Sequence, residues 1–170
     1  RALGFPTSGN EFLAVAKVYE AVLVVVPILV LIRLSGADLA SVLVRRGDLK
    51  WGLGMGALVL FNFATSALIF HSTGYAPAAL GSAVLWGTVF SFSNGLLEEL
   101  WFRSLFLKRL TPLIGATGAI LLTAVWFAII HLLGVTYMPA ITMPIFLVNT
   151  LTLGVGCGLL MHKTGSIWGA

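Results

Sequence analysis

Two adjacent glutamates, an arginine and a histidine stand in stretches of the sequence that otherwise carry no charge. Glu98, Glu99 and Arg103 belong to the segment GLLEELWFRSLF, and His131 ends the segment FAIIH. A carboxylate and an imidazole can take up and release protons, which is the chemistry of general acid–base catalysis. Both can also bind a metal ion. Which chemistry they perform depends on which of them the surrounding elements bring together.

The composition indicates that these elements lie in a membrane. Of the 170 residues, 59% are hydrophobic and 9% are charged, whereas about 25% are charged in an ordinary soluble domain. Crossing a hydrocarbon core of about 30 Å takes ~20 helical residues. Uncharged runs of about this length or more are Trp51–Phe70, Ala78–Leu97, Leu110–Ile130 and Leu132–Met161. The shorter run Ala21–Ile32 extends back to Phe12 if Lys17 and Glu20 pair on one helix face.

These runs do not alternate between apolar and polar residues, which excludes a membrane β-barrel. The final residues, KTGSIWGA, resemble a loop that leads into another helix. We therefore expect an all-α fold, a polytopic transmembrane helical bundle of about five spans plus the start of a sixth. We expect residues 1–170 to form one membrane-embedded domain. Because the chain begins with Arg1 and no signal peptide, we interpret it as an internal piece of a longer protein.

The basic residues predict the orientation in the membrane. Lysines and arginines gather in or beside residues 35–50, 110–117 and 162–165, and the turns between these segments carry none. Short cytoplasmic loops hold the excess of basic residues, so these three segments are predicted to be cytoplasmic. The net charge of +4 then reflects topology, and no nucleic-acid partner is expected. We expect membrane lipid as a partner and the bacterial or archaeal cytoplasmic membrane as the location.

Helix geometry separates the two glutamates. Glu99 and Arg103 are four residues apart with the acid first, the favourable order for a pair on one face. Glu98 points about 100° away from Glu99. Asn94, four residues earlier, shares the face of Glu98 and is a candidate to support it. Asn149 shares a helix face with Gly156 and is predicted to face a cavity between the helices.

A turn predicted at residues 111–118, TPLIGATG, sets the register between two helices. The segments on either side should pair as an antiparallel hairpin. Glu98 and His131 are equally far in sequence from the middle of that turn, so they should lie at one depth. Each is about a dozen residues from its end of the turn, or roughly 18 Å into the bilayer. Glu98 and His131 are thus predicted to meet.

Simpler interpretations stand beside the catalytic one. Glu99 with Arg103 suits a structural ion pair, since charges within membranes are commonly paired. Glu98 with His131 is also compatible with a structural hydrogen bond. A catalytic zinc needs three protein ligands, and only these two side chains converge, so neither a metal nor another cofactor is expected. Gly154 and Gly158 form a small-xxx-small pair typical of close helix packing.

The motifs EELWFR and FAIIH together resemble a known family. They fit the EExxxR and FxxxH signatures of the CAAX prenyl endopeptidase and bacteriocin-processing family of intramembrane proteases, also called CPBP or Abi proteins. The stretches RRGDLKWGLGMG and GVGCGLLMHKTGSIW extend the resemblance over most of the chain. The motifs occur in the family's order and spacing.

The resemblance implies an intramembrane endopeptidase that cuts a hydrophobic or lipid-modified peptide. It assigns Glu98 as the base that activates water and His131 as its catalytic partner. Glu99, Arg103 and Phe127 become supporting residues. The family's remaining histidine, with an asparagine or similar residue four positions later, lies in the helix after TGSIW. His162 precedes that stretch and does not match, so the 170-residue piece is expected to be incomplete and inactive.

Two other classes of protein remain open. One is a non-catalytic membrane scaffold or bacteriocin self-immunity protein on the same fold. The other is a transporter that uses Glu98 as a proton relay, which is disfavoured because no pair of spans shows matched broken helices.

Overall fold

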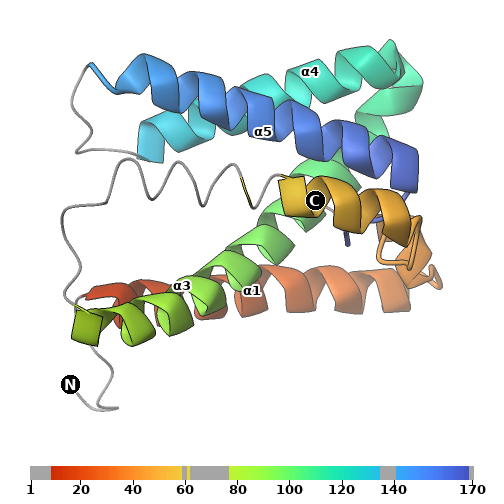
Figure 1. Ribbon diagram of the computed structural model, residues 1–170. Helices are drawn as coiled ribbons and strands as arrows, with labels where there is room; N and C mark the ends of the chain where they lie inside the picture. Colours follow the sequence, from red (N-terminus) through yellow and green to blue (C-terminus); the bar gives the residue numbers. More distant parts are fainter. Residues whose placement is uncertain (1–8, 59–60, 62–76, 135–140, 169–170) are drawn as a thin grey trace. The chain divides into compact units, whose positions relative to one another are not determined.

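The computed structural model describes residues 9–58, 61, 77–134 and 141–168, and these ranges contain helices and turns but no strand (Figure 1). The elements in order are α1 (Gly9–Leu34), the short η1 (Leu39–Val42), a helix at residues 49–58, α3 (Pro77–Glu98), η2 (Glu99–Leu107), α4 (Lys108–Gly134) and α5 (Met143–Thr164). The all-helical fold class is confirmed. Large apolar side chains are exposed along most of these helices, as expected where the surrounding solvent is lipid.

Three stretches of the described residues are long and apolar enough to cross a membrane: Gly9–Leu34, Gly81–Gly134 and Met143–Thr164. The second has 54 residues and contains a backbone break at Gly115. The predicted span at residues 51–70 is helical at 51–58 and lies largely outside the described residues. Residues 165–168 form bends and a turn, and residues 169–170 lie outside the described part, so the start of a sixth helix stays a prediction.

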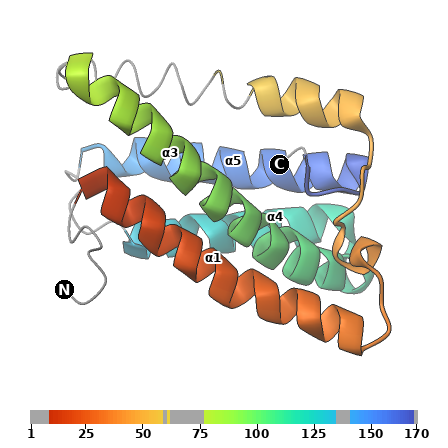
Figure 2. The ribbon, with the colours of Figure 1, turned by 90° about the horizontal axis from the view of Figure 1, so that it is seen from below.

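The chain divides into two compact units, and each is described by itself. The first contains residues 1–38 and 60–98, and the second contains residues 39–59 and 99–170. In the first unit α1 and α3 pack together and run in the same direction (Figure 2).

Two charged residues in the middle of α1 are paired as the sequence predicts. The Lys17 ammonium lies 2.6 Å from the Glu20 carboxylate, one turn away. It also lies 5.9 Å from the centre of the Phe90 ring of α3, close enough for a cation–π attraction. The helix can therefore include Lys17 and Glu20 without an isolated charge.

The second unit contains the predicted hairpin. Gly115 has φ 75° and ψ 165° inside α4, a backbone conformation that favours glycine because it has no Cβ. After this break α4 packs back against η2. The rings of Phe102 and Phe127 meet edge to face at 5.2 Å, and these residues are equally far in sequence from the middle of residues 111–118. The turn, which was predicted at 111–118, is the single break at Gly115, and the helix continues on both sides of it.

Helix α5 packs antiparallel against α4 through its glycines (Figure 1). A Cβ added at Gly154 would lie 2.9 Å from the Cα of Ala124, and one added at Gly158 would lie 3.1 Å from Ile120. Side chains at these positions would force the two helices apart. The close-packing role predicted for Gly154 and Gly158 is therefore confirmed.

This contact predicts different outcomes for two alanine substitutions in α5. Gly154→Ala should destabilise the protein by about 1–3 kcal/mol, because the new methyl group meets the backbone of α4. Gly156→Ala is the matched control, since no described atom lies within 4 Å of the Cβ position there. It should leave stability unchanged or raise it by up to about 1 kcal/mol, because alanine is favoured over glycine inside a helix. Thermal unfolding in detergent measures both, and equal unfolding temperatures would contradict the packing.

The basic segments of the second unit are tied together by hydrogen bonds. The Ile167 N–H donates to the Leu43 carbonyl at 3.1 Å, and the Ser166 hydroxyl donates to the Arg45 carbonyl. The Lys108 ammonium donates to the Ser41 carbonyl at 2.5 Å. Parts of the three segments predicted to be cytoplasmic, or residues beside them, thus meet at one end of this unit.

Candidate active site

The segment that carries Glu99 and Arg103 is a π-helix. It spans η2, Glu99–Leu107, and buries both of these side chains. Its backbone hydrogen bonds join residues five apart instead of four, a rare geometry that is found frequently at functional sites. The Ser104 hydroxyl donates to the Val42 carbonyl at 2.6 Å and so ties η2 to η1. The spacing of Glu99 and Arg103 predicts an ordinary α-helix here, and no sequence pattern indicates the π-helix.

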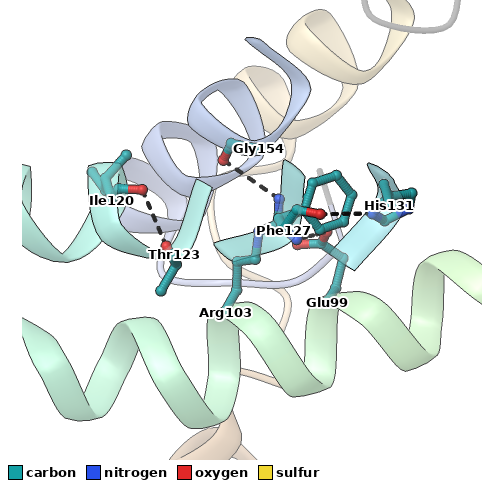
Figure 3. Close-up of polar contacts among 7 residues, drawn as sticks. All are labelled: Glu99, Arg103, Ile120, Thr123, Phe127, His131 and Gly154. Atoms are coloured by element: carbon teal, nitrogen blue, oxygen red, sulfur yellow. Dashed lines mark hydrogen bonds and ion pairs between the residues drawn. The ribbon is translucent and has the colours of Figure 1, made fainter. Parts of the chain in front are cut away.

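Arg103 is held by groups from three elements. Its Nη1 lies 3.1 Å from Oε1 of Glu99, its Nη2 donates to the Gly154 carbonyl at 3.4 Å, and its Cζ lies 4.7 Å from the centre of the Phe127 ring. Figure 3 shows these groups converging on the guanidinium. Only 1% of Arg103 and 6% of Glu99 are exposed. The predicted pair therefore forms and is fully buried.

The aromatic ring of Phe127 attracts the Arg103 guanidinium, whose hydrogen bonds do not satisfy all of its nitrogens. Nε of Arg103 is buried and has no hydrogen-bond acceptor among the described residues. The face of an aromatic ring is negative and attracts a cation most strongly where water is excluded. Phe127 is 2% exposed, so this attraction acts in an apolar environment. The Phe102 ring lies farther away, 5.8 Å from the guanidinium carbon.

His131 is oriented by the same phenylalanine. Its Nδ1 lies 2.9 Å from the Phe127 carbonyl oxygen, one turn earlier in α4. Its ring centre lies 4.1 Å from that of Phe127. A carbonyl oxygen only accepts hydrogen bonds, so Nδ1 must carry the proton. In the neutral imidazole Nε2 is then the nitrogen that can accept a proton.

The remaining predicted site residues lie elsewhere in the chain. Glu98 and Asn94 are half-buried in α3, which belongs to the first unit, whereas His131 belongs to the second. The approach of Glu98 to His131 therefore stays a prediction. Asn149 is exposed on α5. In the described part of the chain, no three or more His, Cys, Asp or Glu side chains lie together as a metal site would require.

Sequence reasoning did not identify the Gly154 carbonyl as a partner of Arg103. It predicted Gly154 as a packing residue, and this role explains the contact. Without a side chain at Gly154, the backbone of α5 can come close enough for its carbonyl to reach the guanidinium. A packing glycine opposite a buried arginine is the signal that would have suggested it.

The motif resemblance is supported by comparison with known proteins. Residues 80–170 match the model of a protein family described as type II CAAX prenyl endopeptidase Rce1-like. This range is more than half of the chain and includes Glu98, Glu99, Arg103, Phe127 and His131. No curated protein and no solved structure matches the chain.

Proposed function

The chain belongs to the Rce1-like family of type II CAAX prenyl endopeptidases, and we propose that it is an intramembrane endopeptidase. It hydrolyses a peptide bond in a hydrophobic or lipid-modified substrate. Glu98 activates the water molecule, and His131 acts with it. Glu99, Arg103 and Phe127 support the two catalytic residues.

One observation carries this proposal. The Phe127 ring contacts both the Arg103 guanidinium and the His131 ring. The EExxxR and FxxxH motifs are therefore physically joined, although α4 must reverse at Gly115 to bring them together. A chance pair of short motifs gives no reason for such a shared contact. The joined motifs fix His131 relative to the helical segment that directly follows Glu98.

The proposed reaction uses Glu98 and His131 to move protons. The Glu98 carboxylate takes a proton from water as the water oxygen attacks the scissile carbonyl carbon. The tetrahedral intermediate then collapses, the C–N bond breaks, and the leaving nitrogen takes up the proton that Glu98 received from water, either directly or through His131. His131, whose Nδ1 is committed to the Phe127 carbonyl, exchanges protons through Nε2. Donors near the carbonyl oxygen stabilise the negative charge that develops on it.

Two amide side chains extend the proposed site. Asn94 lies one helical turn before Glu98 and orients its carboxylate through a hydrogen bond. Asn149, which is exposed on α5, presents an amide toward the cavity and a bound peptide. Glu99 and Arg103 neutralise each other and take no part in proton transfer.

The protein is an integral membrane protein, with three long apolar helices in the described residues. Within the proposal the chain forms one domain of about five spans, located in the cytoplasmic membrane of a bacterium or archaeon. Its partners are membrane lipid and a peptide or protein substrate. Neither a metal nor another cofactor is part of the proposed mechanism.

Cleavage of defined peptides by the full-length protein in proteoliposomes tests this function. We expect hydrolysis at one bond, located by mass spectrometry, and a matched prenylated and unprenylated pair of peptides tests whether the lipid is required. Because Glu98 alone activates the water, a chelator should leave the rate unchanged. Loss of activity with a chelator and recovery with zinc would replace this mechanism by a metal-dependent one. If neither the prenylated nor the unprenylated peptide were cleaved, the proposed protease activity would be contradicted.

A further inference from the structure

A basic cavity lies where the three predicted cytoplasmic segments meet, away from the candidate active site. Its volume is about 340 Å³, and the residues that line it are Leu43, Arg45, Leu107, Lys108, Thr111, Pro112, Met161, His162 and Gly165. Three of these residues have nitrogen-containing side chains that can be cationic, and none is acidic. The second unit contributes all nine.

Arg45 and Lys108, the two permanently charged residues of this cavity, have no acidic partner among the described residues. In the described part of the chain the ion pairs are Lys17–Glu20 and Glu99–Arg103, and neither involves Arg45 or Lys108. A cavity lined by two positive charges and no carboxylate has an unbalanced positive potential. It should attract an anion, which is stabilised most where it contacts both side chains.

Both cations are held in place by backbone carbonyls. Arg45 donates through Nε to the Gly165 carbonyl at 2.5 Å, which leaves its two terminal nitrogens for a ligand. Lys108 donates one proton to the Ser41 carbonyl and has two others. A Cβ at Gly165 would overlap the Arg45 guanidinium, so the glycine makes room for it. Side chains held in this way lose less entropy when they bind an anion.

The backbone at the cavity is also strained. Leu43 has φ 61°, the only positive φ of a non-glycine residue in the described chain. Such a conformation costs about 1 kcal/mol or more, and it persists only where the surroundings impose it. Here the Leu43 carbonyl accepts the Ile167 N–H. The strained backbone at Leu43 therefore presents the carbonyl that holds Ile167, and with it the segment that carries Gly165, beside Arg45.

The position of the cavity favours a ligand from the membrane. It lies beside the end of α5 at Thr164 and the junction of η2 with α4, at the predicted cytoplasmic end of these helices. Pro112 lines it, and the next residues, Leu113 and Ile114, are 77% and 48% exposed. An anionic lipid would place its phosphate between the cations and its chains over these apolar side chains. A soluble phosphate would leave the apolar surface uncovered.

We propose that the cavity of Arg45, Lys108 and His162 binds the phosphate of an anionic membrane lipid. Basic cavities between transmembrane helices on the cytoplasmic side suit such headgroups. Arg45 binds two phosphate oxygens through its terminal nitrogens, and Lys108 binds a third as a point charge. The site does not depend on the proposed peptidase activity, because it shares no residue with the candidate active site.

The test compares two double variants of the full-length protein with the same change in charge. Arg45→Gln with Lys108→Gln removes the cations of the cavity. Arg46→Gln with Arg109→Gln removes their sequence neighbours, which are exposed like Arg45 and Lys108 but do not line the cavity. Phosphatidylglycerol and phosphatidylcholine are titrated onto the protein in detergent, and bound lipid is measured by native mass spectrometry. Unfolding temperatures with each lipid provide a second measurement.

We expect the wild-type protein to bind phosphatidylglycerol in preference to phosphatidylcholine and to unfold at a higher temperature with it. Each basic residue near an anionic headgroup contributes about a fivefold change, so the cavity variant should bind phosphatidylglycerol roughly thirtyfold more weakly. The Arg46 and Arg109 variant should bind within about threefold of wild type. If Arg45→Gln prevents folding, Lys108→Gln alone should still give a roughly fivefold loss.

Three outcomes would overturn the proposal. An equal loss of phosphatidylglycerol binding in the two double variants would show a general effect of surface charge. No difference between the two lipids with the wild-type protein would show that the cavity does not select an anionic headgroup. Stabilisation by millimolar inorganic phosphate that equals the effect of phosphatidylglycerol would assign the site to a soluble phosphate.

Discussion

Replacing Glu98 by glutamine in the full-length protein is expected to abolish cleavage and leave the fold intact. The amide keeps the size and much of the hydrogen bonding of the carboxylate, but it cannot take a proton from water. General base catalysis contributes about 10²- to 10⁴-fold, so kcat should fall by roughly 10³-fold. Glu98→Asp keeps the base, and its shorter reach should preserve little activity. Peptide cleavage in proteoliposomes and thermal unfolding measure the two properties separately.

His131→Ala should reduce cleavage as strongly as Glu98→Gln. The double variant should be no slower than either single one, because residues that act as one unit are not additive. Glu99→Gln is the matched control, since it changes the same charge one residue away. It should lower the unfolding temperature, because Glu99 pairs with Arg103. Full cleavage by the Glu98→Gln variant would end the proposed mechanism.

Replacing Arg103 by alanine is expected to destabilise the protein by about 3–5 kcal/mol. The substitution leaves the buried Glu99 carboxylate without its cation, and an uncompensated charge is costly in an apolar environment. It also removes the contacts with the Phe127 ring and the Gly154 carbonyl. The amount of protein in the membrane and the unfolding temperature in detergent should both decrease. Unchanged values of both would show that the ion pair is dispensable.

A double substitution separates lost charge balance from lost packing. Glu99→Leu with Arg103→Met removes both charges and keeps apolar volume, so it should be more stable than Arg103→Ala alone. Arg103→Lys keeps the charge, but it loses the planar group that binds the carboxylate, the carbonyl and the ring together. The stability of Arg103→Lys should lie between those of the wild-type protein and Arg103→Ala. If the double variant were the least stable of the three, packing by the guanidinium would outweigh its charge.

Local spacing predicted the contacts that lie within one helix or across one turn. The four-residue spacing predicted the Glu99–Arg103 pair, and it survives in the π-helix because residues four apart remain neighbours there. The turn at residues 111–118 predicted a hairpin, and the Phe102–Phe127 contact has the expected register. The chain's match to the family confirms the resemblance based on EExxxR and FxxxH.

Contacts between distant segments were not predicted. Nothing in the local sequence around Arg45 indicates that it reaches Gly165, since these residues are joined by tertiary packing and not by periodicity. The π-helix at Glu99–Leu107 has no recognised sequence pattern. Apolar periodicity also cannot distinguish a helix that ends from one that breaks and continues. This is why the turn proved to be a single break at Gly115.

The ion pair between Glu99 and Arg103 affects how the chain can enter the bilayer during synthesis. Both residues lie on one helical segment, so they can pair as soon as that segment forms a helix, before α4 and α5 have been synthesised. The segment is then inserted with the two charges balanced, whereas a lone charge at the helix centre costs roughly 2.5–3.5 kcal/mol on insertion. The same acid placed on α5 could form an identical contact in the finished protein. Each helix would then carry an uncompensated charge while it was being inserted.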